Sequence, residues 1–172
     1  MRPYRLSDAE SVYAAIRESL PELTPWLPFA HAEYSMKETR EWLKRRSGDW
    51  DTGMAYDFAI LDTGNGNFLG GCGLNRIDYE NRRANLGYWV RTGRAGQGVA
   101  TTATLMLAGF GFRELSLNRV EILVAMGNRR SQRVADKVGA KREGVLRNRL
   151  VVRGKVHDGV MFSLIPQDMP EG

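Results

Sequence analysis

Hydrophobic and polar positions along the chain repeat with two periods, which predict about four helices and six to seven strands. In four segments, apolar residues recur every three or four positions, as on a helix face that packs against a core. The helices are expected from Ser7 onward, from Ser35 to about Arg46, from Val99 to Phe112 and from Asn128 to Val138. Each of the first two begins with a serine three residues before a glutamate, at Ser7–Glu10 and Ser35–Glu38, which predicts two capping boxes.

Shorter segments that are rich in β-branched and aromatic residues predict the strands. They are expected at Met1 to Arg5, Ala55 to Leu61, Asn67 to Ile77, Ala84 to Arg91, Val120 to Ala125, Ala140 to Val152 and Val156 to Ile165. The loop from Asp62 to Asn67 predicts a hairpin, and Gly154 predicts a turn between the last two strands. The first segment is short, which leaves open whether the amino terminus is shortened.

A proline-rich stretch follows the first helix and is expected to end it, because proline fits poorly inside a helix. The prolines are Pro21, Pro25 and Pro28. Large apolar residues stand between and beside them, namely Trp26, Leu27 and Phe29. We expect these residues to pack as a lid onto the core, with a role in lining a substrate site as the alternative.

The order of the elements predicts an α/β (α+β) fold, in which helices cover a mixed sheet. Several strands come first, and the chain then continues as strand, helix, strand, helix, strand and strand. No internal repeat, linker or low-complexity tract divides the 172 residues. Residues 1–172 are therefore expected to form one domain.

Other features of the sequence favour a cytoplasmic protein. No apolar run reaches membrane-spanning length, and the first residues lack the apolar region of a signal peptide. The single cysteine, Cys72, is surrounded by small and apolar residues and is expected to be a buried thiol. The two histidines lie far apart, so no metal cluster and no bound metal are expected.

The net charge of +5 is concentrated in one part of the chain. Between Arg129 and Lys155, ten lysines and arginines stand against two acids, Asp136 and Glu143. Such a segment can attract phosphorylated cofactors, nucleic acid or acidic protein, and solvated helix and strand faces are the simpler explanation. It lacks the interleaved aromatic residues that single-stranded RNA recognition uses, so nucleic acid is not expected as the primary partner.

A glycine-rich loop joins the strand that ends at Arg91 to the helix that begins at Val99. Its glycines, Gly93, Gly96 and Gly98, let main-chain N–H groups approach an anion closely. The first turn of the following helix adds free N–H donors and the positive end of the helix dipole. The spacing Gly-x-x-Gly-x-Gly matches neither the dinucleotide fingerprint nor the P-loop. The loop therefore predicts an anion site, with a plain structural turn as the alternative.

Several other motifs accompany this loop in a fixed order. They are Asn75–Ile77, Gly87–Val90, Leu117–Glu121, Asn128–Ser131, Gly139–Arg147 and Arg153–Asp158. Together with the loop, they resemble the GNAT superfamily of N-acetyltransferases, and within it the bacterial ribosomal-protein N-terminal (alanine/serine) acetyltransferases. In the family's acetyl-coenzyme A (acetyl-CoA) loop, Gln/Arg-x-x-Gly-x-Gly/Ala, Gly96 and Gly98 match, and Gly93 replaces the usual Gln or Arg. The resemblance implies a GNAT-like, mostly antiparallel sheet that is splayed between its fourth and fifth strands.

The resemblance also implies a reaction, in which an amine attacks the thioester of acetyl-CoA directly within a ternary complex. Main-chain groups around Trp89 and Val90 would polarise the thioester carbonyl. Main-chain N–H groups of Arg94 to Ala100 would bind the pyrophosphate, with the Thr101 hydroxyl nearby. Asn128 would contact the pantetheine arm and also cap a helix. Ser131 would donate a hydrogen bond or a proton to the departing thiolate, with an ordinary surface serine as the alternative.

Arg91 and Arg94 would add charge-assisted bonds to phosphate, unless they are simply exposed to solvent. The full set of cofactor-binding residues that the resemblance implies is Trp89, Val90, Arg91, Arg94, Ala95, Gly96, Gln97, Gly98, Val99, Ala100, Thr101, Asn128 and Ser131. Many members of the superfamily carry a tyrosine a few residues after the position of Ser131, and this chain has none between Ser131 and Gly172.

The general base is not marked by the resemblance. Relatives often carry glutamates at two positions where this chain has Asn85 and Leu150, and neither of these side chains can accept a proton. The remaining candidates are Asp78, Glu80, His31, Glu33, His157 and Asp158. A peptide α-amine, with a reference pKa of about 8 against about 10.4 for lysine, needs less help from a base and is the easier acceptor.

Several functions therefore stay open at the level of the sequence. The leading one is N-acetylation of a primary amine, with the α-amine of a ribosomal or other protein as the acceptor that the resemblance suggests. A small-molecule amine acetyltransferase is the alternative within enzymes. The absent glutamates leave a non-catalytic acyl-CoA sensor open, and the basic segment leaves an RNA- or ribosome-associated role open. Relatives often pair through the late strands, so the resemblance also suggests a homodimer.

Overall fold

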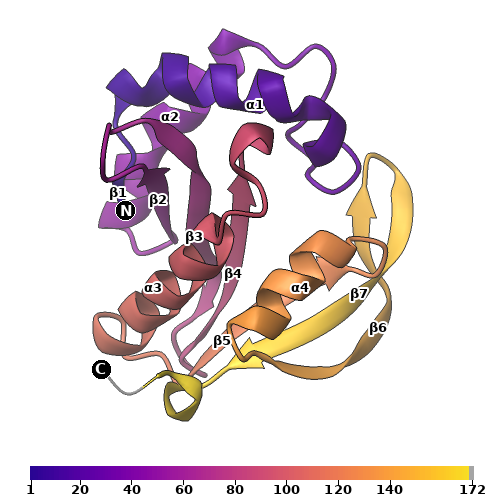
Figure 1. Cartoon of the computed structure of the whole chain (residues 1–172). Helices are drawn as coiled ribbons and strands as arrows, with labels where there is room; N and C mark the ends of the chain where they lie inside the picture. Colours follow the sequence, from indigo (N-terminus) through magenta and orange to yellow (C-terminus); the bar gives the residue numbers. More distant parts are fainter. Residues whose placement is uncertain (171–172) are drawn as a thin grey trace.

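The computed structural model describes residues 1–170, in which seven strands form one sheet in the order β1-β2-β3-β4-β5-β7-β6 (Figure 1). The strands are β1 (Arg2–Pro3), β2 (Ala55–Leu61), β3 (Phe68–Asp78), β4 (Arg83–Val90), β5 (Arg119–Ala125), β6 (Lys141–Val152) and β7 (Lys155–Leu164). The α-helices are α1 (Ala9–Leu23), α2 (Met36–Asp51), α3 (Val99–Arg113) and α4 (Arg129–Lys137). This architecture confirms the mixed, mostly antiparallel fold that the sequence predicts.

Strands β4 and β5 are the parallel neighbours in this sheet, and they pair over only part of their length. The paired residues are Arg83 with Arg119, Ala84 with Val120, and Asn85 with Glu121. β4 then continues to Val90 without a partner on that side, and Figure 1 shows the two strands diverging. The sheet is thus splayed between its fourth and fifth strands, as expected.

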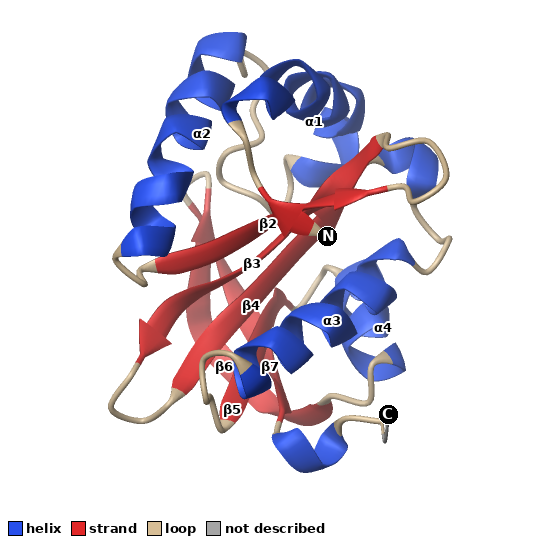
Figure 2. Cartoon of the chain, turned by 90° about the vertical axis from the view of Figure 1, so that its left-hand side faces the viewer, coloured by secondary structure: helices blue, strands red, loops and turns tan. Residues whose placement is uncertain are grey.

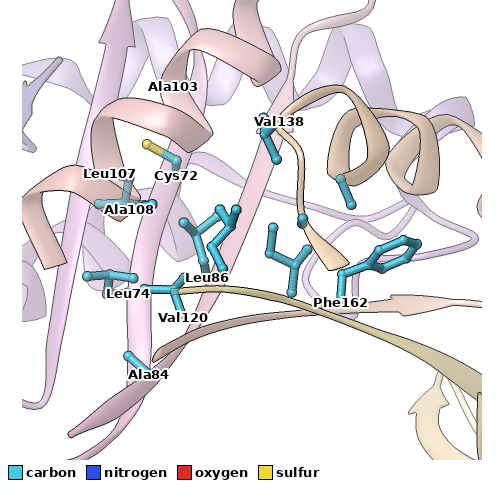
Figure 3. Close-up of a cluster of buried hydrophobic side chains, with 14 of the residues drawn as sticks. Cys72, Leu74, Ala84, Leu86, Ala103, Leu107, Ala108, Val120, Val138 and Phe162 are labelled. Carbon is cyan, nitrogen blue, oxygen red and sulfur yellow. The ribbon is translucent and has the colours of Figure 1, made fainter. Parts of the chain in front are cut away.

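Each strand sends alternate side chains to opposite faces of the sheet, and the helices cover both faces (Figure 2). On one face α3 and α4 bury the larger core, in which Leu74, Leu86 and Phe162 are almost fully enclosed (Figure 3). On the other face, a smaller core of α1 and the sheet includes Val12 and Ile16. The sites discussed below lie at the opening between β4 and β5 and under α1 and α2.

Cys72 belongs to the larger core and is 4% exposed, which confirms the predicted buried thiol. Burial raises the pKa of this thiol to about 12, because a thiolate is poorly solvated among apolar side chains. The thiol is therefore protonated at neutral pH and is a structural group.

The start of α1 differs from the prediction. No capping box forms between Ser7 and Glu10; a 3₁₀ turn from Leu6 to Asp8 precedes the helix instead. The Asp8 carboxylate accepts a hydrogen bond from the Arg5 amide at 2.8 Å and pairs with Arg2 at 2.6 Å. The ion pair ties β1 to this turn, and the local cap lies two residues earlier than predicted, between Arg5 and Asp8 instead of Ser7 and Glu10.

Two further helix boundaries also differ from prediction. Helix α1 continues through Pro21 to Leu23, although the proline was expected to end it. Helix α2 continues past Arg46 to Asp51, because Trp50 packs edge-on against Tyr56 and Phe58 of β2. The Ser35–Glu38 capping box is confirmed, with the Ser35 amide donating to Glu38 Oε2 at 2.9 Å and the Glu38 amide to Ser35 Oγ at 3.3 Å.

An ion-pair cluster joins the three strands at the β6 side of the sheet. The Arg119 guanidinium of β5 donates to both carboxylate oxygens of Glu143 on β6, at 2.7 and 2.6 Å. The buried Ser163 hydroxyl of the intervening β7 donates to the same carboxylate at 2.7 Å. Arg119 first, and Ser163 second, hold the pKa of Glu143 down at about 2.

This cluster predicts a pH-dependent contribution to stability. Because the folded pKa of Glu143 lies below its usual value, the contribution is present above the unfolded pKa and is lost as the pH falls toward about 2. We expect Glu143→Gln to lower the free energy of unfolding by about 1 kcal/mol at pH 7, since the pair is partly exposed. Urea unfolding followed by circular dichroism should show this difference shrinking between pH 5 and pH 3.

Glu80→Gln is the matched control, because Glu80 is exposed and has no ion-pair partner among residues 1–170. It should change the free energy of unfolding by less than about 0.5 kcal/mol at either pH. A deficit of Glu143→Gln that stayed constant from pH 7 to pH 3 would contradict the assignment.

Candidate active site

The glycine-rich loop leaves β4 at Val90 and enters α3 at Val99. Gly96 and Gly98 adopt left-handed conformations with φ of 78° and 81°. A Cβ at either position would meet no atom within 4 Å, so glycine is favoured here by backbone conformation and not by lack of space. Gly98 is also the residue that directly precedes α3, so the loop delivers its main chain straight into the helix.

The main-chain amides of this loop fall into two groups. Those of Arg94 and Ala95 are engaged, because they donate to the carbonyls of Arg91 at 3.0 Å and Thr92 at 3.1 Å. The amides from Gly96 to Thr101 have no acceptor among residues 1–170. Unpaired amides at the start of a helix, together with the helix dipole, form an anion site. The available donors thus begin two residues later than the predicted range of Arg94 to Ala100 and end one residue later, at Thr101.

Helix α1 holds the start of the loop in place. Arg91 forms an ion pair with Glu18 and also donates to the Phe68 carbonyl at 3.3 Å. The Arg91 guanidinium holds the pKa of Glu18 below its usual value. Next along the chain, the Thr92 amide donates to the buried Ser19 hydroxyl at 2.9 Å. Of the two arginines predicted to reach phosphate, Arg91 is thus committed to Glu18, whereas Arg94 has no ion-pair partner among the described residues.

The start of α4 carries the other predicted cofactor contacts. Asn128 Oδ1 accepts a hydrogen bond from the Ser131 amide at 3.1 Å, which confirms the predicted helix cap. The Ser131 hydroxyl donates to the Tyr88 hydroxyl at 3.0 Å, and the Tyr88 hydroxyl donates to the Ser131 carbonyl at 2.9 Å. Tyr88 lies on β4, so this paired contact bridges the opening between β4 and β5.

Tyr88 is a site residue that the sequence analysis missed. Burial raises its pKa to about 12, so its hydroxyl stays protonated and can donate at neutral pH. The available signal was the alternation of side chains along β4. It sends Tyr88 and its neighbour Trp89 to opposite faces of the sheet. The contact partner, Ser131, is 43 residues away along the chain, which hides the pair from any local motif.

Trp89 and Val90 lie at the opening, as expected from their place at the end of β4. On one side they pair with Gly71 and Gly70 of β3. On the other side β5 has already diverged, so the strand edge is free to contact a ligand. These are the main-chain groups that the resemblance to GNAT acetyltransferases would use to polarise the thioester carbonyl.

The six candidate bases lie in three different places. Asp78 and Glu80 are at the β3–β4 turn, the end of β4 opposite to the glycine loop. His31 binds Glu38 at 2.7 Å, beside the start of α2, and the Glu33 side chain is 85% exposed. The Asp158 carboxylate accepts from the Asn148 amide at 2.8 Å within the β6–β7 hairpin.

His157 is the candidate that lies beside the start of α4. On β7 it lies two residues before Gly159, which stands opposite Ala125 at the end of the pairing with β5. Its ring is 6.3 Å from the ring of Trp26, and a Cβ at Gly127 would lie 2.9 Å from that same tryptophan. His157 also stands directly opposite Leu150 of β6. At the other position where relatives often carry a glutamate, the side-chain amide of Asn85 donates to the side-chain oxygen of Asn75 at 3.1 Å.

The family described as "Acetyltransferase (GNAT) domain" matches residues 1–141. The chain belongs to the GNAT acetyltransferase family. It is 34% identical over 168 residues to "Putative ribosomal N-acetyltransferase YdaF" of Bacillus subtilis (strain 168), covering 94% of this chain and 87% of that protein. This finding confirms the enzyme class and the ribosomal-type resemblance.

Solved structures of GNAT acetyltransferases superimpose on the whole fold. A structure described as a putative ribosomal-protein-serine acetyltransferase from Vibrio cholerae is 30% identical, with a TM-score of 0.84 over 96% of this chain and 92% of the other. Mycobacterium smegmatis RimJ in complex with CoA-disulfide is 28% identical, with a TM-score of 0.86 over 99% of this chain and 83% of the other. For this GNAT acetyltransferase, acetyl-CoA is the donor that family membership implies.

None of the helices within residues 1–170 is both long and apolar enough to cross a membrane. No three His, Cys, Asp or Glu side chains within that range gather in a way that could hold a metal ion.

The unpaired amides predict that a negative charge in the loop blocks the cofactor. We expect Gly96→Asp to raise the dissociation constant for acetyl-CoA by at least roughly tenfold, because a carboxylate would occupy or repel the phosphate site. Isothermal titration calorimetry with the purified protein measures this change directly.

Gly66→Asp is the matched control for backbone strain. Gly66 has a φ of 73° and open space at its Cβ position, and it lies in the β2–β3 loop, outside the glycine-rich loop. It should leave the dissociation constant within about twofold of wild type. If Gly96→Asp also bound acetyl-CoA normally, the loop would not be the phosphate site.

Proposed function

We propose that this GNAT acetyltransferase moves the acetyl group of acetyl-CoA to the α-amine of a protein chain, ribosomal or other, by direct attack within a ternary complex. The observation that carries the proposal is the pairing of two features at one end of β4. The amides from Gly96 to Thr101 are free to take an anion, and the β4 edge beside them faces an opening instead of another strand.

The cofactor would be held from three directions. The Gly96–Thr101 amides and the Arg94 guanidinium suit a pyrophosphate, because both supply donors and positive charge. The opening between β4 and β5 suits an extended arm such as pantetheine, which can hydrogen-bond to a free strand edge. Main-chain groups of Trp89 and Val90 would then polarise the thioester carbonyl.

In the reaction, the amine nitrogen forms a bond to the acetyl carbon while the carbon–sulfur bond breaks. The sulfur leaves as a thiolate and the amine loses a proton. Ser131 would donate to that thiolate, and Tyr88 would then turn its own hydroxyl toward Ser131, since the two groups are already 3.0 Å apart. In this exchange the Ser131 hydroxyl, which donates to Tyr88 in the structure, would turn toward the opening.

His157 is the residue we assign to accept the amine proton. It shares a sheet face with Trp89, because both lie on the face opposite to α3 and α4. The Met126 amide donates to the Asp158 carbonyl at 2.9 Å, which places this part of β7 beside the entry to α4. An imidazole accepts and releases protons near neutral pH, as a general base requires.

The proposal is tested by measuring CoA release from acetyl-CoA in the presence of different amines. One peptide with a free α-amine, the same peptide with a blocked α-amine and an internal lysine, and a polyamine form the panel. We expect turnover with the free α-amine only, together with a mass gain of one acetyl group on the peptide. Ser131→Ala should lower kcat by about 10- to 100-fold and leave acetyl-CoA binding intact.

Other outcomes of the same assay would identify the alternatives. Turnover with the polyamine alone would make the protein a small-molecule acetyltransferase. Tight binding of acetyl-CoA without release by any amine would make it an acyl-CoA sensor, the role that the absent glutamates at Asn85 and Leu150 leave open.

The assignment of His157 gives a separate prediction. His157→Ala should lower kcat with an α-amine peptide by about 100-fold, since a general base contributes a factor of this size. The dissociation constant for acetyl-CoA should not change. Val156→Ala is the control, because Val156 precedes His157 on β7 and is 57% exposed. Equal losses in the two variants would argue against a catalytic role for His157.

A further inference from the structure

An aromatic pocket lies under α1 and α2, on the sheet face opposite to α3 and α4. It encloses about 250 Å³, and its walls are mostly rings and aliphatic side chains. The apolar lining includes Val12 and Ile16 of α1, Trp42 of α2, Trp89 of β4, and Phe29 and Tyr34 of the segment between the helices. We call this cavity the aromatic pocket.

The aromatic pocket begins one side chain away from the proposed reaction centre. The Trp89 ring forms part of its wall, while the Trp89 main chain borders the opening between β4 and β5. The Phe29 ring lies 6.4 Å from the Trp89 ring and is 40% exposed, so it stands where the pocket meets solvent. A group attached next to an amine at the opening would therefore lie near the Trp89 ring that forms part of the pocket wall.

Polar groups do not account for the pocket. The Glu38 carboxylate lines it but already accepts from the Ser35 amide at 2.9 Å and binds His31 at 2.7 Å. Glu41 and Arg45, the other charged residues of the lining, are exposed on α2. Apolar cavities with so few free polar partners hold water poorly, so an apolar ligand group gains by filling this one.

We propose that the aromatic pocket binds the side chain of the first residue of the acceptor, and that this residue is large and apolar. This inference rests on the proposed function and adds the substrate class to it. A cavity of about 250 Å³ is smaller than the roughly 300–1,000 Å³ typical of sites for whole drug-sized ligands, so it suits one side chain. Methionine, leucine or phenylalanine would fill it, whereas alanine or serine would leave most of its apolar wall without a contact.

The test compares peptides that differ only in their first residue, at saturating acetyl-CoA. Peptides beginning with methionine, leucine or phenylalanine should show kcat/KM values at least about tenfold above those beginning with alanine or serine, as expected when a pocket gains or loses several methylene groups. Binding of the same peptides to the protein with CoA present, measured by calorimetry, should follow the same order.

Phe29→Ala tests the pocket itself. Because Phe29 is partly exposed, this variant should fold, yet it removes a wall of the pocket. It should lower kcat/KM for the leucine peptide at least about fivefold and leave the alanine peptide and acetyl-CoA binding unchanged. Met54→Ala is the control, since Met54 is 69% exposed and lies outside the pocket lining.

The outcomes separate this inference from the proposed function. Equal or better turnover of alanine and serine peptides would overturn the inference and leave α-amine acetylation standing. Absence of acetylation with every peptide would overturn the proposed function, and the pocket inference would then rest on the binding data alone. If leucine peptides bound no tighter than alanine peptides, the pocket inference would be overturned as well.

Discussion

The divergence of β4 from β5 is the constraint on which the rest of the site depends. Parallel strands normally bond along their whole length, yet here the pairing stops at Asn85 and Glu121. Five residues of β4 beyond that point keep a free edge inside the sheet, where unpaired main-chain groups are costly unless a ligand or water satisfies them. A fold that keeps such an edge open has a strand ready to receive an extended ligand.

The opening is held apart by packing on both sides. Helix α3 follows β4 and helix α4 follows β5, so each diverging strand carries its own helix. The Tyr88–Ser131 pair then joins β4 to α4 across the opening, and α1 holds the glycine loop through Glu18 and Ser19. The loop amides and the strand edge are thereby fixed before any ligand arrives, and preorganised donors of this kind stabilise developing charge most effectively.

Much of this fold could be predicted from the sequence, because its periods are strong and its turns carry glycine. The strands around the opening and the helix after Gly98 were found from local patterns alone. The local patterns failed where a distant partner decides the outcome. Arg91 pairs with Glu18, 73 residues away, instead of being left for phosphate.

Tyr88 shows the same limit within the active site. Its motif was visible in the sequence, but its role depends on the position of α4, which no short window of sequence contains. The position of the unpaired amides in the glycine-rich loop is a further feature that local sequence did not predict. They begin at Gly96 and not at Arg94, because a 3₁₀ turn from Thr92 to Arg94 uses the earlier amides first. Such turns depend on the anchor at Ser19 as much as on the loop itself.

The absence of carboxylates at Asn85 and Leu150 can be understood together with the acceptor. A general base matters most when the amine is a strong one, and an α-amine has a reference pKa of about 8. Near neutral pH the neutral fraction of such amines is far larger than that of lysine side chains, with their reference pKa of about 10.4, so an α-amine needs less help from a base. The imidazole that we propose as the base, His157 on β7 across from Leu150, would then take up the proton that leaves as the amide forms. The chemistry of the acceptor and the sparse set of bases on this sheet face are therefore consistent with each other.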